Sequence, residues 1–355
     1  MRKQLLALFA LIALPAVLWA QEPIRNIIYL IGDGMGLSSV TMMQLAEGTP
    51  TIFDRAENIA LLRTSSADNR VTDSAASGTA LATGSKTNNT YLGVTPEGEE
   101  LLSLTALASQ QGRATGVVVT TYLQHATPAA FYSHSDSRHN MPLITRQLTT
   151  SHLDVAIGGG MHYFVEEYGD GVAAVLNAEG KQLATSLDEV ASLDGGERVV
   201  ALLADYDMGA DSGDYLKSAT LEALRLLEAR GGEKGFVLMV EGSLIDGMGH
   251  ANNAEAMQHE MRGFMAAVEC AVEYARSNAG TLVVVTADHE TGGLGLVSGN
   301  ADFNLSEQGV EYRWCTSGHS AQMVPVYLYG AGAELINGIM ENSELGAMLK
   351  SFLEK

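Results

Sequence analysis

One short stretch carries acidic and imidazole side chains at a spacing that suits a divalent metal. An apolar run, Phe236–Val240, leads into Glu241, and Asp246 and His250 follow. The run has the length and β-branched content of a buried strand. If a helical turn begins near Leu244, Asp246 and His250 share one helical face. Zinc takes His nitrogen and Asp oxygen, and magnesium takes carboxylate oxygen, so the stretch favours a metal site. A strand end followed by a solvated acidic turn would give the same pattern.

A second acid follows the apolar run Ile27–Ile31, in Gly-Asp-Gly-Met-Gly around Asp33. These glycines resemble the start of a dinucleotide fingerprint, but that motif needs glycine where Leu37 stands. A carboxylate there would also repel a pyrophosphate. A metal-binding carboxylate on a tight turn fits better than either a dinucleotide site or an ordinary turn.

Further ligand types follow the Val-rich run Thr281–Thr286. Asp288 and His289 are adjacent at its end, and glycines just beyond would let the chain curl away. His319 precedes the last apolar run and adds one more imidazole, although a lone histidine of this kind is usually polar surface. Together the acids and histidines suffice for two nitrogen-and-oxygen zinc sites and one oxygen-rich magnesium site. Paired metals of this kind support phosphoryl transfer.

Two polar residues could handle the phosphate itself. Ser74 stands at the predicted start of a small-residue helix, Ser74–Ala82. It could be an ordinary N-cap, or a nucleophile that the free N–H groups of the helix favour. The neighbourhood lacks a Ser-His-Asp arrangement and a Gly-x-Ser-x-Gly elbow, so a metal would have to activate it. An isolated arginine such as Arg138 is usually solvated, but in a phosphate site its planar guanidinium could bind two phosphate oxygens.

The elements that must position these residues alternate between apolar strands and amphipathic helices. The pattern predicts a three-layer α/β/α sandwich around a large, mostly parallel central sheet. In such sheets chemistry lies at the carboxyl ends of the strands, which is where Asp33, Glu241 and Asp288 stand. Residues 169–193 are predicted to form a small α/β excursion. Because no repeat or linker interrupts the chain, residues 21–355 are predicted to be one catalytic domain.

Composition and the first residues set the cellular context. Residues 1–20 combine a basic start, an apolar stretch and a small residue at Ala20, which predicts a secretory signal peptide and an exported, periplasmic or secreted protein. The sequence indicates no stable membrane anchor. The net charge of −21 argues against nucleic acid as a partner. Cys270 and Cys315 leave a disulfide open.

The chain resembles the alkaline phosphatase family from Asn26 to about Tyr329. The resemblance is carried by Asp-Ser-Ala-Ala-Ser-Gly-Thr-Ala around Ser74, Val-Glu-Gly…Ile-Asp…His, and Thr-Ala-Asp-His-Glu, in the family's order. It implies hydrolysis of phosphate monoesters through a phosphoserine on Ser74, with release of inorganic phosphate. It also implies that Arg138 clamps the phosphate. A homodimer is one candidate for the assembly, which the sequence leaves open.

The resemblance implies three metal-ligand sets. They are Asp246, His250 and His319 for a first zinc, Asp33, Asp288 and His289 for a second zinc, and Asp33, Thr127 and Glu241 for magnesium. Two positions depart from the best-known bacterial pattern: His125 stands where that pattern has Asp, and Gly247 where it has Lys. His125 is therefore a candidate neighbour of the third metal and the phosphate. The chain is also short for the family, so surface insertions and crown-like interface elements are expected to be missing.

Three other functions would need different residues at particular positions or would leave some of these residues without a role. A sulfatase needs Pro and Arg two and four residues after the nucleophile, where this chain has Ala76 and Gly78. A phosphodiesterase of the same superfamily would use much the same metals, but Arg138 favours a monoester because it can bind the additional charged oxygen. A non-catalytic metal- or phosphate-binding protein would have no need of Ser74 as a nucleophile.

Overall fold

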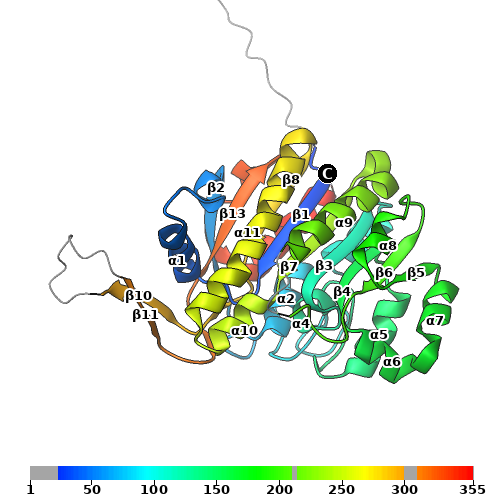
Figure 1. The fold of residues 1–355 in the computed structure, drawn as a ribbon, viewed down its shortest axis with the longest axis horizontal. Coiled ribbons are helices and arrows are strands. Elements are labelled where there is room, and N and C mark those ends of the chain that lie inside the picture. The colour runs from blue at the N-terminus through cyan, green and yellow to red at the C-terminus, as the bar shows by residue number, and fades with distance from the viewer. Residues whose placement is uncertain (1–22, 210–213, 300–309, 355) are drawn as a thin grey trace, which may run out of the picture.

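A ten-stranded β-sheet forms the centre of the molecule in the computed structural model, which describes residues 23–209, 214–299 and 310–354 (Figure 1). In spatial order its strands are β14 (Gly338–Glu341), β2 (Asn58–Arg63), β13 (Val324–Gly330), β8 (Thr281–Thr286), β1 (Asn26–Gly32), β7 (Phe236–Gly242), β3 (Ala114–Tyr122), β4 (Val155–Gly159), β6 (Arg198–Leu202) and β5 (Lys181–Ala184). The strand β13 is antiparallel to both of its neighbours, and the other neighbouring strands are parallel.

The central strands are apolar along their whole length because both faces of the sheet are covered. Every residue of β1, β7 and β8 is buried, as expected for parallel strands between two helical layers. Nearer the edge, β2 mixes buried and exposed positions. The apolar runs that predicted the strands are thus the signature of their central place in the sheet.

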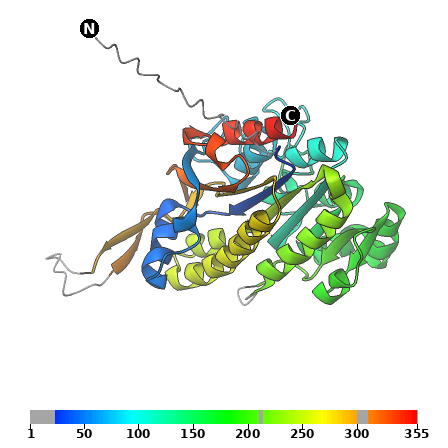
Figure 2. The same ribbon diagram turned by 90° about the horizontal axis from the view of Figure 1, so that it is seen from above.

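Helices lie on both sides of the sheet (Figure 2). One layer contains α9 (Tyr215–Gly231) and α11 (Ala254–Ser277), which pack on each other and on the central strands. The other contains α2 (Ser74–Thr83), α3 (Leu104–Gln110) and α12 (Asn342–Leu353). The predicted three-layer α/β/α sandwich with a mostly parallel sheet is therefore confirmed.

The remaining helices of the described residues contain between 4 and 11 residues. They are α1 (Leu37–Glu47), α4 (Ala126–Ala129), α5 (Met141–Thr150), α6 (Met161–Tyr168), α7 (Val172–Ala178), α8 (Leu187–Ala191) and α10 (Leu244–His250), with 3-10 turns η1 (Phe53–Arg55), η2 (Gly169–Gly171), η3 (Gly232–Lys234) and η4 (Ala333–Leu335). The predicted excursion contains α7, β5 and α8, and β5 forms one edge of the main sheet.

Two small strand pairs are absent from the sequence prediction. The pair β10 (Leu294–Ser298) and β11 (Val310–Trp314) is antiparallel and stands away from the body (Figure 1). The other pair, β9 (Glu290–Thr291) and β12 (His319–Ser320), is only two residues long. Most residues of β10 and β11 are partly or fully exposed, so they lack the apolar run that marks a buried strand.

Two further properties follow from the described residues. None of their helices combines the length and apolarity that crossing a bilayer requires. Cys270 is buried and Cys315 is exposed, and both are free thiols. The disulfide that the sequence left open is therefore not formed.

Candidate metal centre and active site

Parallel pairing brings the three strand-end acids to one edge of the sheet. The strand β1 lies between β7 and β8, so Asp33, just past β1, stands between Glu241 and Asp288. All three side chains are fully buried. Gly34 has φ +73° and its amide donates to Asp288 Oδ1 at 3.1 Å. A Cβ there would lie 2.8 Å from Cα of Asp246, so glycine is what lets α10 approach the acids.

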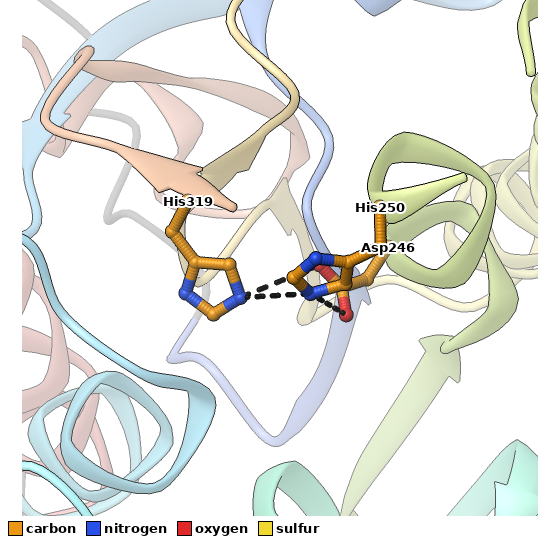
Figure 3. Close-up of side chains that lie close together, drawn as sticks. All are labelled: Asp246, His250 and His319. Carbon is orange, nitrogen blue, oxygen red and sulfur yellow. Dashed lines mark hydrogen bonds and ion pairs between the residues drawn. The ribbon is translucent and has the colours of Figure 1, made fainter. Parts of the chain in front are cut away.

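A first group contains Asp246, His250 and His319, whose candidate ligand atoms lie within 4.8 Å of one another (Figure 3). Nε2 of His250 lies 3.2 Å from Oδ2 of Asp246 and 3.2 Å from Nε2 of His319. The predicted i, i+4 pair does stand on one helix, because α10 spans Leu244–His250.

The backbone orients both imidazoles of this group. Nδ1 of His250 donates to the carbonyl of Ser317 at 2.6 Å, and Nδ1 of His319 donates to the carbonyl of Thr72 at 2.8 Å. A carbonyl can only accept, so each Nδ1 carries the proton and each Nε2 is left to bind a metal. Such secondary contacts are typical of metal-ligating histidines.

A second group forms around His289, which is fully buried. Its Nε2 lies 3.1 Å from Oδ2 of Asp288 and 3.5 Å from Oδ1 of Asp33. Asp33 and His289 also group with Asp246 within 4.8 Å. The resemblance assigned Asp246 to the first set alone, whereas the structure puts it within reach of both sets.

Thr291, which the sequence prediction missed, donates to Oδ1 of Asp246 and contacts Nδ1 of His289 at 3.2 Å.

A third group joins Asp33 and Glu241 with His125. Thr127, from α4, donates to Oδ2 of Asp33 at 3.4 Å. Nε2 of His125 lies 3.2 Å from Nη2 of Arg138. Since a guanidinium can only donate, His125 accepts as a neutral ring. Burial, reinforced by the charge of Arg138, lowers the pKa of His125 to about 4.

The acids of these groups are short of protein partners. Asp33 Oδ1, Asp288 Oδ2 and both carboxylate oxygens of Glu241 accept no hydrogen bond from the described residues. Burial and the charge of Asp288 raise the pKa of Glu241 to about 8, and the same two causes raise the pKa of Asp33 well above its ordinary value. Buried anions left unpaired are costly. This donor set therefore fits bound cations.

Ser74 is the first residue of α2 and is almost fully buried. The N-cap is Asp73, whose side chain accepts from the amide of Ala76 at 3.0 Å. Ser74 is therefore not the N-cap of the helix, which was the alternative interpretation of its position. Its Oγ lies 3.2 Å from Nε2 of His289. Ser77 holds α2 in place by donating to the carbonyl of Asp288 at 2.6 Å.

Arg138 is held from two sides rather than solvated. Its Nη1 donates to Oδ2 of Asp73 at 3.2 Å, and Nη2 contacts His125. Its backbone amide donates to the carbonyl of Thr90, which has φ +74°. Asp73 and Thr90 are positioning residues that the sequence prediction missed. The signal for Asp73 was its place directly before Ser74 in the motif.

Comparison with known proteins identifies the family of the chain. The sequence model of the family described as alkaline phosphatase matches residues 24–308. The chain belongs to the alkaline phosphatase family. It is 36% identical over 304 residues to alkaline phosphatase 4 of Bacillus subtilis (strain 168), an alignment that covers 79% of this chain and 64% of that protein. It is 33% identical over 335 residues to the alkaline phosphatase of Escherichia coli (strain K12), covering 76% and 71%.

Solved structures of alkaline phosphatases share the fold. The enzyme from the Antarctic bacterium TAB5 superposes with a TM-score of 0.86 at 34% identity, covering 94% of this chain and 99% of that one. The cold-active enzyme from Shewanella sp. gives 0.85 at 31% identity, covering 93% and 100%. Alkaline phosphatases are metal-dependent, and the described Asp and His groups could hold metal.

Proposed function

We propose that this alkaline phosphatase hydrolyses phosphate monoesters by transferring the phosphoryl group to Ser74 and then to water. The observation that carries the proposal is the position of Ser74 Oγ. It lies at the start of α2, 3.2 Å from a buried histidine that is itself surrounded by carboxylates. A hydroxyl in such a place can attack phosphorus, because the helix N-terminus favours the incoming phosphate.

The chain's own residues account for substrate placement and for the two transfers. Arg138, fixed by Asp73 and His125, offers its guanidinium to two phosphate oxygens. In the first transfer Ser74 gives its hydroxyl proton to water, the Ser74 Oγ–P bond forms as the ester P–O bond breaks, and the alcohol leaves with a proton taken from water, so that the protons balance. In the second, a water oxygen attacks phosphorus, and inorganic phosphate departs as Ser74 is restored. Both displacements are in line.

We assign two zinc ions and one magnesium ion to the three groups. The assigned ligands are Asp246, His250 and His319 for one zinc, Asp33, Asp288 and His289 for the other, and Asp33, Thr127 and Glu241 for magnesium. The unpartnered acids support this assignment. Bound at these positions, the ions would neutralise the carboxylates and stabilise negative charge on the oxygens of the reacting phosphate.

His125 sets the metal preference of the third group in this proposal. A TAB5 alkaline phosphatase variant in which aspartate replaces a histidine holds magnesium in its M3 site. We take His125 as the counterpart of that histidine, because it groups with Asp33 and Glu241. Since magnesium prefers oxygen ligands, we expect zinc or cobalt to compete for the wild-type site. His125→Asp should shift bound metal towards magnesium, which metal analysis after dialysis against mixed ions would measure.

The proposal is tested by comparing p-nitrophenyl phosphate with its bis ester and by trapping the intermediate. We expect rapid turnover of the monoester, slow turnover of the diester, and acid-stable phosphate on Ser74 after quenching. Chelation should abolish turnover, and zinc with magnesium should restore it. A preference for the diester would make the chain a phosphodiesterase, and metal binding without turnover of either ester would make it a binding protein.

We also propose that the chain is exported and that residues 21–355 act as one catalytic domain. The predicted signal peptide, residues 1–20, lies outside the described residues. N-terminal sequencing of the protein from cell fractions would test the cleavage after Ala20. A homodimer would be detected by light scattering.

A further inference from the structure

The carboxylate of Glu290 is buried, and the proposed reaction does not use it. The side chain is 1% exposed and belongs to none of the groups of candidate metal ligands among the described residues. Oε1 of Glu290 accepts from the amide of Leu294 at 3.1 Å, and Oε2 accepts from the hydroxyl of Ser320. The oxygens of Glu241 lack such partners among the described residues, whereas the carboxylate of Glu290 is satisfied by the protein itself.

The two donors stand at the two ends of an excursion from the body. Leu294 is the first residue of β10, and Ser320 is the last residue of β12. The strands β10 and β11, which stand away from the body, lie between them in the sequence (Figure 1). One carboxylate thus ties the start of this excursion to its end, where the candidate ligand His319 directly precedes Ser320.

The strand that carries His319 is very short. The strand β12 pairs with β9 at two positions, His319 with Thr291 and Ser320 with Glu290. Glycine follows β9 and precedes β12, and short pairs rich in glycine specify their register weakly. Opposite residues share a face and successive residues alternate. The first pair therefore faces the metal ligands, which Thr291 contacts, and a slip of one residue would turn the imidazole away.

The partner strand β9 is fixed to the turn that follows β1. The amide of Thr291 donates to the carbonyl of Gly34 at 3.2 Å. The stem of Glu290 lies over Gly36, where a Cβ would overlap its Cγ. The strand β9 is therefore a fixed base, and the carboxylate of Glu290 transfers its position to β12. The ring of His319 thereby faces the rest of the first group (Figure 3).

We propose that Glu290 is a positioning residue that holds β12 in register, so that His319 can bind the first zinc with the other two ligands of its group. Glu290 itself binds no metal. This inference rests on the zinc assignment of the proposed function, and it names the residue that orients one of the ligands. Loss of a partner that orients a metal ligand typically lowers metal affinity by about 10- to 100-fold.

Three variants separate the hydrogen bonds of Glu290 from its volume. Glu290→Met keeps a side chain of similar length but accepts neither bond, so zinc affinity at the first site should fall by about 10- to 100-fold. Ser320→Ala removes only the bond across the strand pair and should lower this affinity by about tenfold. Glu290→Gln should stay within about twofold of wild type, because its amide can accept from Leu294 and donate to Ser320. Competition with a zinc chelator measures each affinity, and the second zinc is the internal reference.

A double-mutant cycle with His319→Ala tests whether Glu290 acts through His319. If it does, Glu290→Met should not weaken zinc binding further in the His319→Ala protein. Because Ser320 is only half-buried, Ser320→Ala takes the place of Glu290→Met in the cycle if that variant does not fold. An equal loss of zinc affinity in both backgrounds would overturn the inference, and so would wild-type affinity in Glu290→Met and Ser320→Ala.

Asp154→Asn is the matched control. It also replaces a buried carboxylate that accepts from a backbone amide and a side chain, but at the amino end of the sheet. It should lower the thermal unfolding midpoint and leave zinc affinity unchanged. A loss of zinc affinity as large as that of Glu290→Met would show that reduced stability alone explains the effect. Zinc affinity is measured without turnover, so wild-type protein that binds zinc but does not hydrolyse p-nitrophenyl phosphate would contradict the proposed function and not this inference.

Discussion

Buried acids lie at both ends of the central sheet and are partnered in opposite ways. At the amino end, Asp154 directly precedes β4. Its Oδ2 accepts a hydrogen bond from the amide of Thr115 at 2.9 Å, and its Oδ1 accepts one from Nε of Arg230 at 2.5 Å. Arg198 lies 3.7 Å from the same carboxylate. At the carboxyl end, both oxygens of Glu241 lack a hydrogen-bond partner among the described residues.

The difference separates a charge that supports the fold from charges kept for a ligand. Asp154 is neutralised by protein groups, so its burial is compatible with stability. Burial and the charge of Asp288 raise the pKa of both Glu241 and Asp33, so the protein alone does not offset the cost of burying these two charges. The carboxyl end is therefore destabilised by charges that remain available for a ligand.

The largest effect is expected at the nucleophile. Ser74→Ala should lower turnover of p-nitrophenyl phosphate by roughly a thousandfold or more, because the phosphoryl acceptor is lost. Bound metal and the thermal unfolding midpoint should stay close to wild type. Ser186→Ala is the matched control, since Ser186 also stands at a helix N-terminus, where it accepts from the amide of Glu189. Near-normal turnover by Ser74→Ala would contradict the assignment.

The acids at the two ends of the sheet should respond oppositely to neutralisation. After chelation, Asp154→Asn should lower the free energy of unfolding by about 1–3 kcal/mol, because it leaves two arginines without their anion. Glu241→Gln should instead raise it by about 1 kcal/mol, because glutamine removes a buried carboxyl group whose charged form is disfavoured by burial. Urea unfolding measures both. With metals present, Glu241→Gln should bind less magnesium. Equal destabilisation by both changes would remove the contrast.

A smaller effect is expected where the carboxyl end lacks a positive charge. A Cβ on Gly247 meets no atom within 4 Å, so a lysine there has room beside Asp246. Gly247→Lys should tighten inhibition by inorganic phosphate roughly threefold to tenfold, because it adds a cation near the anion. Gly171→Lys, equally open but on η2, is the control. An unchanged inhibition constant in Gly247→Lys would show that this position does not face the phosphate.

The smallest effect concerns Lys181, a buried cation at the amino end of β5. Its Nζ donates to the carbonyl of Leu148 and to Ser151 Oγ, both at 2.9 Å. Burial, with the charge of Arg198, lowers its pKa from 10.5 to about 7. Between these values the unfolded chain binds the additional proton, so the contribution of Lys181 to the free energy of unfolding should rise with pH.

Thermal unfolding across that pH window measures the contribution of Lys181. The stability of wild type relative to Lys181→Met should increase from pH 7 to pH 10.5. Lys217→Met, which replaces an exposed lysine on α9, is the matched control. A flat profile for Lys181→Met would mean that the buried ammonium keeps its proton throughout.

The sequence alone determined the residue types of the site and the elements that carry them. An apolar run followed by an acid identifies a strand end, and the carboxyl ends of parallel strands share one edge, so Asp33, Glu241 and Asp288 could be expected together. The helix start at Ser74 follows from small residues after Asp73. These inferences are local, and each depends on a few neighbouring residues.

Only the tertiary structure decided how the ligands are shared. The place of Asp246 between two groups requires α10 to approach the turn at Gly34, and these segments lie far apart in the chain. His125 comes beside Asp33 and Glu241 because β3 pairs with β7 and β7 with β1, an order that hydrophobic periodicity does not encode. The exposed pair β10–β11 had no buried face to mark it. Distances between side chains depend on strand order and packing, which arise from contacts between segments remote in sequence.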